Sequence, residues 1–207
     1  MNIVNAYAFV EHANINPEKA VIATAGDSLT GRALLGVAHE KKFPVISIVR
    51  NESEKRKLEE LDAENILVQD DNNFEAQLES LSQELNATTV YDGVGGPLLT
   101  RIIPLLPSGT TVFSYGFLAY YSGQGGVNFD TTTLFVKKLT LTSYGVVINE
   151  TVRNKEKLKI ALDDIKNIVN LPHFKIKIGQ LFTPEEYKEA LEYATNIKND
   201  SKAVITF

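Results

Sequence analysis

The sequence predicts an α/β fold, a doubly wound parallel sheet of six strands followed by a C-terminal appendage of helices and strands. Three observations predict this fold. Short β-branched runs alternate with amphipathic helical stretches, and such alternation implies right-handed crossovers with helices on both faces of the sheet. The first runs are apolar throughout, as buried parallel strands are. The chain of 207 residues is 43% hydrophobic, so it can bury a sizeable core.

The predicted elements follow one another regularly along the first part of the chain. Strands are expected at 19–25, 44–50, 64–69, 88–94, 109–116 and 137–147, with helices at 29–42, 52–61, 73–85 and 97–106. Asn51 is a suitable N-cap for the second of these helices. The tail differs, with helices at 155–170 and 184–197 and extended segments at 174–182 and 202–207. These last elements form the predicted appendage.

Composition narrows the class of partner. The chain has 21 Lys and Arg against 26 Asp and Glu, a net charge of −5 spread along the sequence, which argues against nucleic acid and anionic membranes as partners. It has no cysteine, and its three histidines are too scattered for a zinc site, so no metal is expected. The N-terminal residues lack a basic, apolar targeting pattern, and no apolar run reaches a membrane-spanning length. We expect a cytoplasmic protein that binds small molecules or proteins.

The turn after the first strand is the first candidate ligand site. In doubly wound sheets the ligand lies beyond the carboxyl ends of the strands, where helix N-terminal N–H groups can bind a pyrophosphate. The loop consists of Ala25, Gly26, Asp27, Ser28, Leu29, Thr30 and Gly31, so the strict G-x-G-x-x-G pattern is absent. Gly31 suits close helix–strand packing, and Ser28 can donate its N–H and hydroxyl to a phosphate. The alternative is that Ser28 only caps the helix.

The end of the second strand indicates which nucleotide fits. Arg50 lies 19 residues after Gly31, at a position where an NAD site requires a carboxylate and an NADP site a cation. A guanidinium group suits phosphate binding, so NADP(H) is favoured over NAD(H) and over S-adenosylmethionine. The alternative is that Arg50 and the cations after it form a solvent-exposed helix face without a ligand. We adopt this interpretation for Arg56 and Lys57.

The ends of the fourth and fifth strands add glycines and aromatic residues. Gly93, Gly95 and Gly96 follow the fourth strand, and Tyr115 and Gly116 end the fifth. Glycines there let the backbone approach a nucleotide, although tight turns before helices would also explain them.

No catalytic residue can be assigned from the sequence. Tyr91 is expected to pack in or beside the sheet, and Asp92 is a weak candidate for reaching the cleft. No Tyr-x-x-x-Lys dyad and no Ser/His/Asp arrangement is present.

These residues resemble the cofactor-binding domain of the medium-chain dehydrogenase/reductase superfamily, in its zinc-independent quinone oxidoreductase and enoyl reductase branches. The resemblance covers nearly the whole chain and rests on VIATAGDSLTGRALLGVA, VISIVRNESEKRKLEELDAENIL, VYDGVGG, LPSGTTVFSYG, LFVKKLTLTSYGV and the tail IGQLFTPEEYKEALEYA to SKAVITF. The family's A-x-x-G-x-x-G loop falls on Ala25, Ser28 and Gly31, so Ser28 replaces the middle glycine. The resemblance implies a Rossmann fold.

The resemblance also implies roles for individual residues. The contact to the 2′-phosphate falls on Arg50, with Asn51 and Lys55 beside it, and contacts to the nicotinamide half fall on Val94, Gly95, Tyr115 and Gly116. The expected division is a lead-in helix at 1–18, a dinucleotide-binding domain at 19–148 and C-terminal helices and strands at 149–207. Family members carry a preceding GroES-like domain, and because the first residues resemble the helix that enters the cofactor domain, we expect that domain to be missing from this chain.

Three functions therefore remain open. The chain can be the NADP(H)-binding domain of an oxidoreductase that passes hydride to a quinone or an activated enone or enoyl substrate, inactive without a catalytic partner domain. It can be a stand-alone reductase whose cleft is completed by oligomerisation, or a non-catalytic interaction module with a degenerate nucleotide loop. A homodimer joined through the sixth strand is expected, because that strand ends the sheet; alternatively, Lys137 and Lys138 protect the edge.

Overall fold

The computed structural model describes residues 2–195 and 201–207. A six-stranded sheet has the order β3-β2-β1-β4-β5-β6, and every neighbouring pair is parallel. Its strands are β1 Val21–Ala23, β2 Val45–Val49, β3 Asn65–Val68, β4 Thr89–Asp92, β5 Thr111–Ser114 and β6 Thr140–Ser143. The order reverses between β1 and β4, which creates the crevice where doubly wound folds bind ligands. The predicted fold class is confirmed.

The central strands are short and buried. Ile22 of β1 pairs with Ile46 of β2 on one side and with Val90 of β4 on the other. Every residue of β1 and β2 is buried, as expected of strands covered on both faces. The strands are shorter than the apolar runs that predicted them, because the residues at both ends of each run lie in the connections between strands and helices.

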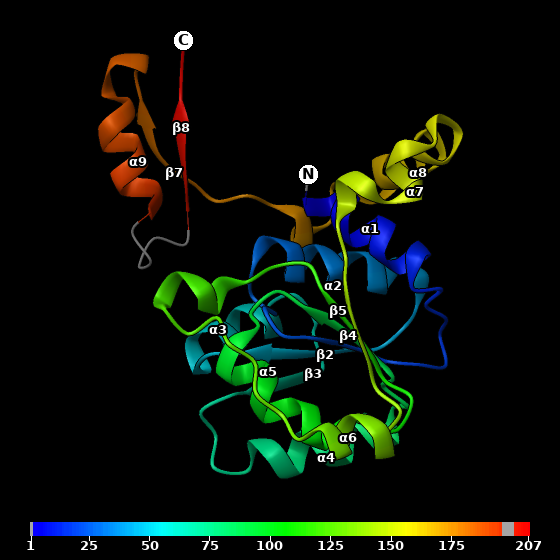
Figure 1. Cartoon of the computed structure of the whole chain (residues 1–207). Helices are drawn as coiled ribbons and strands as arrows, with labels where there is room; N and C mark the ends of the chain where they lie inside the picture. The colour runs from blue at the N-terminus through cyan, green and yellow to red at the C-terminus, as the bar shows by residue number, and fades with distance from the viewer. Residues whose placement is uncertain (1, 196–200) are drawn as a thin grey trace. The chain divides into compact units, whose positions relative to one another are not determined.

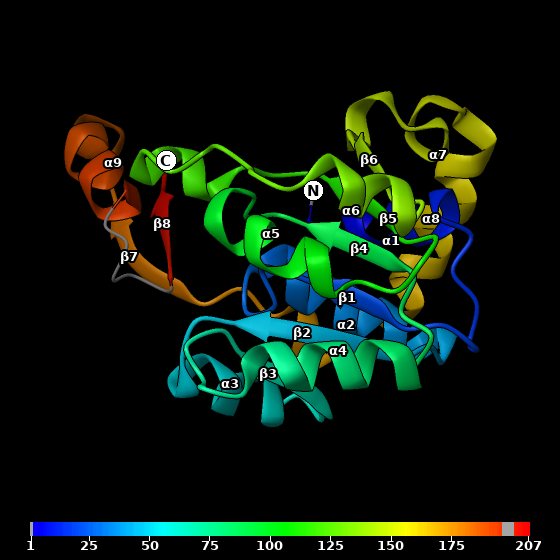
Figure 2. The same cartoon turned by 60° about the horizontal axis from the view of Figure 1, so that its bottom comes forward.

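Helices cover both faces of this sheet (Figures 1 and 2). They are α1 Asn2–His12, α2 Leu29–Lys41, α3 Glu52–Glu59, α4 Phe74–Glu84, α5 Gly96–Ile102, α6 Thr131–Val136, α7 Glu150–Arg153 and α8 Lys155–Ile168. In Figure 1, α4, α5 and α6 lie below the sheet and α1 and α2 above it. The lower face buries Phe74 and Leu78 of α4 and Ile102 of α5 against the central strands, so α4 and α5 are fixed by apolar packing.

The residues that begin the helices also position the site. Ser28 caps α2 and Asn51 caps α3, each by accepting a hydrogen bond from a backbone N–H three residues later. Ser28 lies in the turn that follows β1, and Asn51 stands two residues after β2, so the starts of α2 and α3 lie at the carboxyl edge of the sheet.

The C-terminal residues form a second compact unit, Phe174–Phe207. Here β7 Ile178–Phe182 and β8 Lys202–Ile205 pair in parallel, with α9 Tyr187–Thr195 between them in the chain. The two strands make a small sheet of their own and do not extend the large one. The contacts divide the chain after His173, whereas the sequence placed the last boundary after residue 148. Met1 and the end of the helix expected at 184–197 lie outside the described residues.

Candidate functional site

The loops that follow β1, β4 and β5 meet at the carboxyl edge of the sheet. Thr24, directly after β1, donates its N–H to the carbonyl oxygen of Tyr91 at 3.3 Å, and Tyr115 donates its N–H to the carbonyl oxygen of Asp92 at 2.8 Å. The loop residues assigned from the sequence therefore lie around the crevice between β1 and β4.

Ser28 organises the first loop. Its Oγ accepts a hydrogen bond from the N–H of Gly31 at 3.0 Å, and its own N–H donates to the carbonyl oxygen of Ala25 at 3.0 Å. The Ser28 N–H is therefore used by the turn, and the capping role considered as the alternative is present. The N–H groups of Leu29 and Thr30 belong to the first turn of α2, where backbone N–H groups have no acceptor within a helix.

Gly31 is required by close packing. A Cβ at this position would lie 2.3 Å from the carbonyl oxygen of Ala25 and 2.4 Å from that of Gly26. No side chain fits at such distances, so α2 starts in direct contact with the loop. The nearby Gly26 donates its N–H to the carbonyl oxygen of Ile48 at 3.0 Å, which ties the loop to β2.

A charged cluster beside this loop was not assigned from the sequence. The Asp27 carboxylate lies 3.5 Å from Nζ of Lys57 and 3.8 Å from Nε of Arg32. Burial raises the pKa of Asp27 above its ordinary value, although both cations act in the opposite direction. Glu54 also raises this pKa. The carboxylates of Asp27 and Glu54 therefore lie near the cations of Lys57 and Arg32 at the start of α2. The one feature of the sequence that could have indicated this cluster is the aspartate in the loop.

Arg50 is paired with Glu54. The Glu54 carboxylate accepts hydrogen bonds from the Arg50 backbone N–H at 2.9 Å and from its Nε at 2.6 Å, and the Nη2 group adds an ion pair. The side chain of Glu54 is 9% exposed and that of Arg50 is 64% exposed. The guanidinium group therefore projects into solvent at the end of β2 and is held from its buried side.

The two residues assigned beside Arg50 lie on or next to α3. Asn51 Oδ1 accepts the N–H of Glu54 at 3.0 Å, so this side chain is used as the helix cap. Lys55 lies half-buried on α3.

Asp92 stabilises the site from within. Its fully buried carboxylate accepts hydrogen bonds from Thr24 Oγ1 at 2.7 Å and Ser114 Oγ at 3.1 Å. The N–H groups of Val94 and Gly95 donate to the same carboxylate at 3.2 and 3.1 Å. Asp92 thus joins the ends of β1, β4 and β5, and these bonds give it a structural role.

Tyr115 lies across the crevice. Its ring stacks on Tyr91 with centroids 4.0 Å apart, and Tyr91 stacks in turn on Phe9 of α1, also at 4.0 Å. A Cβ on Gly93 would lie 2.5 Å from the Tyr115 hydroxyl oxygen, so the glycine at this position leaves room for the phenol. Burial raises the pKa of Tyr115 to about 12, so the phenol stays protonated at neutral pH. Tyr91 packs inside the fold as expected.

The segment after β5 folds back over the loop after β4. Leu118 and Ala119 donate their N–H groups to the carbonyl oxygens of Gly93 and Val94 at 3.2 and 3.0 Å. Gly95 has a φ of +69°, a conformation that glycine adopts readily. Gly116 approaches Gly93 so closely that a Cβ would lie 2.8 Å from its carbonyl oxygen. Val94, Gly95, Tyr115 and Gly116 are therefore neighbours.

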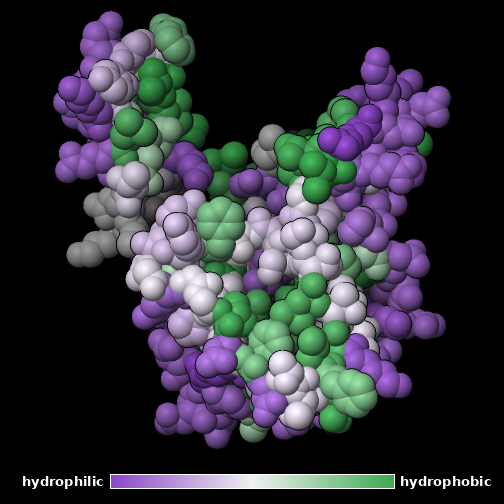
Figure 3. Space-filling model, viewed as in Figure 1, coloured by the Kyte–Doolittle hydropathy of each residue, from purple (hydrophilic) through white to green (hydrophobic). Residues whose placement is uncertain are grey.

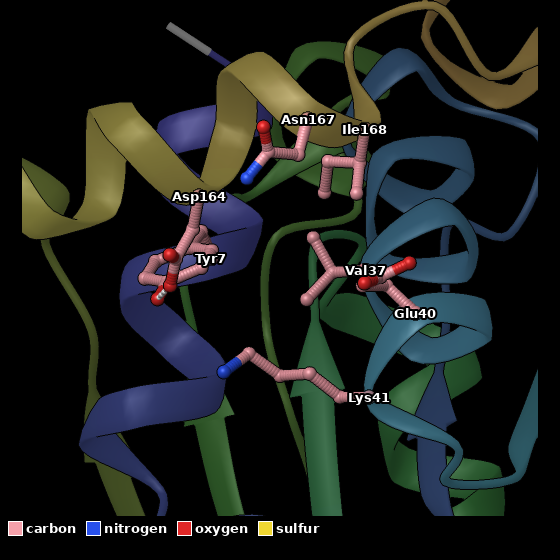
Figure 4. A pocket seen from close by; sticks show the side chains of 7 residues that line it. All are labelled: Tyr7, Val37, Glu40, Lys41, Asp164, Asn167 and Ile168. Carbon is pink, nitrogen blue, oxygen red and sulfur yellow. Dashed lines mark hydrogen bonds between the residues drawn. The ribbon is translucent and has the colours of Figure 1, made fainter.

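A separate cavity of about 250 Å³ lies among α1, α2 and α8 (Figure 4). The Tyr7 hydroxyl donates to Asp164 across it, and Lys41 binds Glu11 at 2.8 Å while lying 4.8 Å from the centre of the Tyr7 ring. None of the site residues assigned from the sequence lines this cavity. It is a polar junction between helices.

Two absences hold for the described parts of the chain. No group of three or more His, Asp or Glu residues in 2–195 and 201–207 is arranged to hold a metal ion. Over the same residues, each helix is too short or too polar to cross a bilayer.

Comparisons with known structures agree with this geometry. No family model matches the sequence, and no curated protein matches it. A proposed NADPH:quinone reductase from Mesorhizobium loti is similar over 100% of this chain and 58% of its own, with a TM-score of 0.83 and 22% identity. A mutant form of an enoyl thioester reductase from Candida tropicalis has a TM-score of 0.77 and 20% sequence identity, and the match covers 100% of this chain and 59% of that one. CurA from Vibrio vulnificus, solved in complex with NADPH, has a TM-score of 0.74 and 16% sequence identity, and the match covers 100% of this chain and 62% of that one.

These likenesses show the fold. The chain is a Rossmann-type α/β chain with the architecture of one part of longer reductases, and it spans about 60% of the length of the structures it matches.

Proposed function

We propose that this chain is the NADP(H)-binding domain of a zinc-independent oxidoreductase that passes hydride from NADPH to a quinone or an activated enone or enoyl substrate. The observation that carries the proposal is the meeting of the Ala25 to Gly31 loop, the Arg50 guanidinium and the glycine turn at Gly95 on one edge of the sheet. The neighbours named as NADPH enzymes or solved with NADPH support the same cofactor.

The residues present fit a dinucleotide. Gly31 leaves no side chain between α2 and the loop, so a pyrophosphate can approach the free N–H groups of Leu29 and Thr30. The glycine turn around Gly95 leaves room for the nicotinamide end, because a Cβ there would meet nothing within 4 Å. When bound, NADPH supplies the hydride, and the chain's own residues hold and orient it.

Arg50 selects the phosphorylated cofactor. Its exposed guanidinium group stands at the end of β2, where the adenosine ribose would lie, and the Glu54 carboxylate beside it is bound to Arg50 itself. Glu54 binds the guanidinium through Nε and Nη2, which leaves Nη1 for a phosphate oxygen. We propose supporting contacts from Lys55 on α3, whereas Asn51 acts by capping that helix.

The test is a titration of NADPH and NADH with fluorescence detection on three proteins: the unmodified chain, Arg50→Glu and the control Arg56→Glu. The unmodified chain should prefer NADPH. Arg50→Glu should weaken NADPH binding by about 1–3 kcal/mol, the range for a charge-assisted contact. Arg56→Glu makes the same charge change on the exposed side of α3, so its effect should be small. Equal affinity of the unmodified chain for both nucleotides would contradict the proposal.

Catalysis requires residues from outside this chain to complete the substrate cleft. In the described residues no acid, base or oxyanion-binding group is assigned, since Asp92 is buried and saturated with hydrogen bonds. We propose that a GroES-like partner domain completes the substrate cleft, and the chain alone should show little turnover with NADPH and a quinone or an enoyl thioester. Robust turnover by the pure chain would favour a stand-alone reductase.

We also propose a homodimer formed through β6. All four residues of β6 are exposed, and so are Phe135, Val136, Val147 and Ile148 around it. Apolar residues gather over α6 and the adjoining edge in the space-filling view (Figure 3). An uncovered apolar edge of this kind suits pairing with a second copy.

The alternative is a non-catalytic interaction module. It is favoured by the capping role of Ser28 and by the Arg50–Glu54 pair, which occupy two groups that a nucleotide would use. Absence of NADPH binding by the folded chain would select this alternative.

A further inference from the structure

Three aromatic side chains gather on the exposed segment that follows β5. Phe117, Tyr120 and Tyr121 lie in or just before the short 3-10 helix Leu118–Ser122, and their exposed fractions are 59%, 66% and 76%. Aromatic side chains are usually buried for most of their area, because each offers a large apolar surface. Three exposed rings within 117–121 therefore indicate a surface that contacts a ligand or another molecule.

The three rings form one cluster with a defined geometry. The ring centroids of Phe117 and Tyr121 lie 5.7 Å apart, and the two planes are inclined by 34°. Tyr120 stands nearly perpendicular to both, at 85° to Phe117 and 78° to Tyr121, with centroids 6.2 and 6.0 Å away. A flat ring lying along the planes of Phe117 and Tyr121 would therefore meet Tyr120 edge to face. Stacked and edge-to-face pairs are both favourable for aromatic rings.

Backbone contacts hold this cluster against the turn at Gly95. Ala119 donates its N–H to the carbonyl oxygen of Val94 at 3.0 Å, and Gln124 donates its N–H to the carbonyl oxygen of Ala119 at 3.0 Å. A Cβ on Gly96 would lie 2.2 Å from the Gln124 carbonyl oxygen and 2.6 Å from the Ala119 Cβ, so the segment packs directly on the start of α5. The cluster therefore lies beside the turn that we assign to the nicotinamide end, where an electron acceptor must bind.

The chemistry of the cluster favours one of the acceptors open to the proposed function. A quinone has a flat, electron-poor ring, and the faces of phenylalanine and tyrosine rings are electron-rich, so the two attract each other when they stack. The hydroxyl groups of Tyr120 and Tyr121 can donate hydrogen bonds to a quinone carbonyl oxygen. An enone or enoyl thioester without a ring has no flat face that would use the three aromatic side chains.

We propose that Phe117, Tyr120 and Tyr121 bind the ring of the electron acceptor, and that a quinone is therefore the substrate class of this oxidoreductase. This inference rests on the proposed function and chooses between the acceptors that it leaves open. In the overall reaction the quinone takes a hydride from NADPH and a proton from water and leaves as the hydroquinone. The aromatic cluster is the acceptor-binding surface that this chain itself contributes to the cleft.

The experiment measures the binding of three probes to the unmodified chain by ligand-observed NMR. Anthraquinone-2-sulfonate is a water-soluble quinone whose quinone ring has no free position for addition to lysine. Anthracene-2-sulfonate has the same rings and charge but no carbonyl groups, and 3-penten-2-one is an enone without a ring. A titration with NADPH on the same preparation tests the proposed function separately.

Two double variants separate the aromatic rings from their hydroxyl groups. Tyr120→Leu combined with Tyr121→Leu removes two rings, whereas Tyr120→Phe combined with Tyr121→Phe keeps the rings and removes only the hydroxyls. Tyr187→Leu is the matched control, because Tyr187 is also exposed and lies on α9, outside the cluster. Thermal melting of each variant checks the fold.

The unmodified chain should bind anthraquinone-2-sulfonate more tightly than anthracene-2-sulfonate and should not bind 3-penten-2-one. The double leucine variant should raise the Kd of anthraquinone-2-sulfonate about tenfold, because two aromatic contacts are lost. The double phenylalanine variant should raise this Kd about threefold, the effect of a lost hydrogen bond, and leave the Kd of anthracene-2-sulfonate unchanged. Tyr187→Leu should change neither Kd.

Other results overturn the inference in distinguishable ways. Quinone affinity that is unchanged in the folded double leucine variant, or lowered equally by Tyr187→Leu, refutes the aromatic site. A folded chain that binds NADPH but not the quinone, or binds 3-penten-2-one equally well, refutes the quinone assignment and leaves the proposed function standing. Failure of the folded chain to bind NADPH refutes the proposed function and the acceptor role of the cluster with it.

Discussion

The carboxylate of Glu54 binds Arg50 at both its backbone N–H and its side chain, at 2.9 Å to N and 2.6 Å to Nε. The pair spans the end of β2 and the first turn of α3, and its acid is buried while its base is exposed. The cation proposed to choose the cofactor is therefore oriented, and partly neutralised, by a neighbour four residues along the chain.

Replacing Glu54 by Gln separates orientation from charge. The carboxylate accepts the guanidinium with Oε1 and the backbone N–H with Oε2. The amide oxygen keeps the bond to the guanidinium, the bond to the backbone N–H is lost, and the negative charge that repels a 2′-phosphate is removed. We expect Glu54→Gln to bind NADPH about three- to tenfold more tightly, as removal of one partly screened charge allows. NADH affinity should not change, and fluorescence titration measures both. Weaker NADPH binding would mean that the ion pair orients Arg50 more than it repels the ligand.

Asp27 makes stability depend on pH. Burial raises the pKa of Asp27 in the folded chain despite Lys57 and Arg32, with Glu54 adding to the rise. The folded state then holds the proton more tightly than the unfolded state, so stability decreases as pH rises from the ordinary range of a carboxyl group through the raised value. At pH values above the raised pKa, the ionised Asp27 carboxylate lowers the free energy of unfolding by an amount that no longer changes with pH.

The variant Asp27→Asn removes this cost. It should raise the free energy of unfolding at pH 7 and leave it unchanged below the ordinary range of an aspartate, as measured by urea denaturation at several pH values. Asp163→Asn is the control with the opposite sign, because the Lys166 bond lowers the pKa of Asp163. Lower stability of Asp27→Asn at pH 7 would contradict this sign.

Asp92 should be the most sensitive polar residue of the site. Asn in its place would turn one acceptor oxygen into a donor facing Thr24, Ser114 or the N–H groups of Val94 and Gly95. We expect Asp92→Asn to lose about 2–4 kcal/mol of unfolding free energy, typical of a disrupted buried network. Urea denaturation measures the loss, with Asp70→Asn at an exposed position as the control. A near-native stability would show that the network tolerates a donor.

The fold could be predicted because its signals are local. The apolar runs that became β1 and β2 are buried on both faces, and Asn51 caps α3 as its position predicted. The helices α6 and α7 were not predicted: they have six and four residues, too few for a helical periodicity to be recognised.

The site could be predicted only in part. Arg50 stands at the strand end that its spacing from Gly31 indicated, but its pairing with Glu54 depends on how the chain turns into α3. The Asp92 bonds to Thr24 and Ser114 join the ends of strands far apart in the sequence. Such contacts follow from the strand order β1-β4-β5, which no sequence pattern specifies.

The proposed dimer has its most direct test in the backbone of β6. Thr140 and Tyr144 donate their N–H groups to β5, at 3.0 Å to Thr110 and 2.8 Å to Ser114. Because side-by-side strands alternate the direction of successive N–H groups, the Leu141 N–H points away from β5, toward the open edge. Proline at this position therefore removes a donor that only a second copy would use, whereas proline at Thr142 would damage the sheet itself.

Lys137 is one of the two lysines of the alternative in which charged side chains protect the edge. Its ammonium group donates to the carbonyl oxygen of Leu106 at 2.9 Å, within the same chain. Light scattering at micromolar concentration should therefore give a dimer for the unmodified chain and a monomer for Leu141→Pro, with little change in thermal stability of the monomer fold. A dimer that persists in Leu141→Pro, or an unmodified chain that is monomeric, would show that β6 is not the interface.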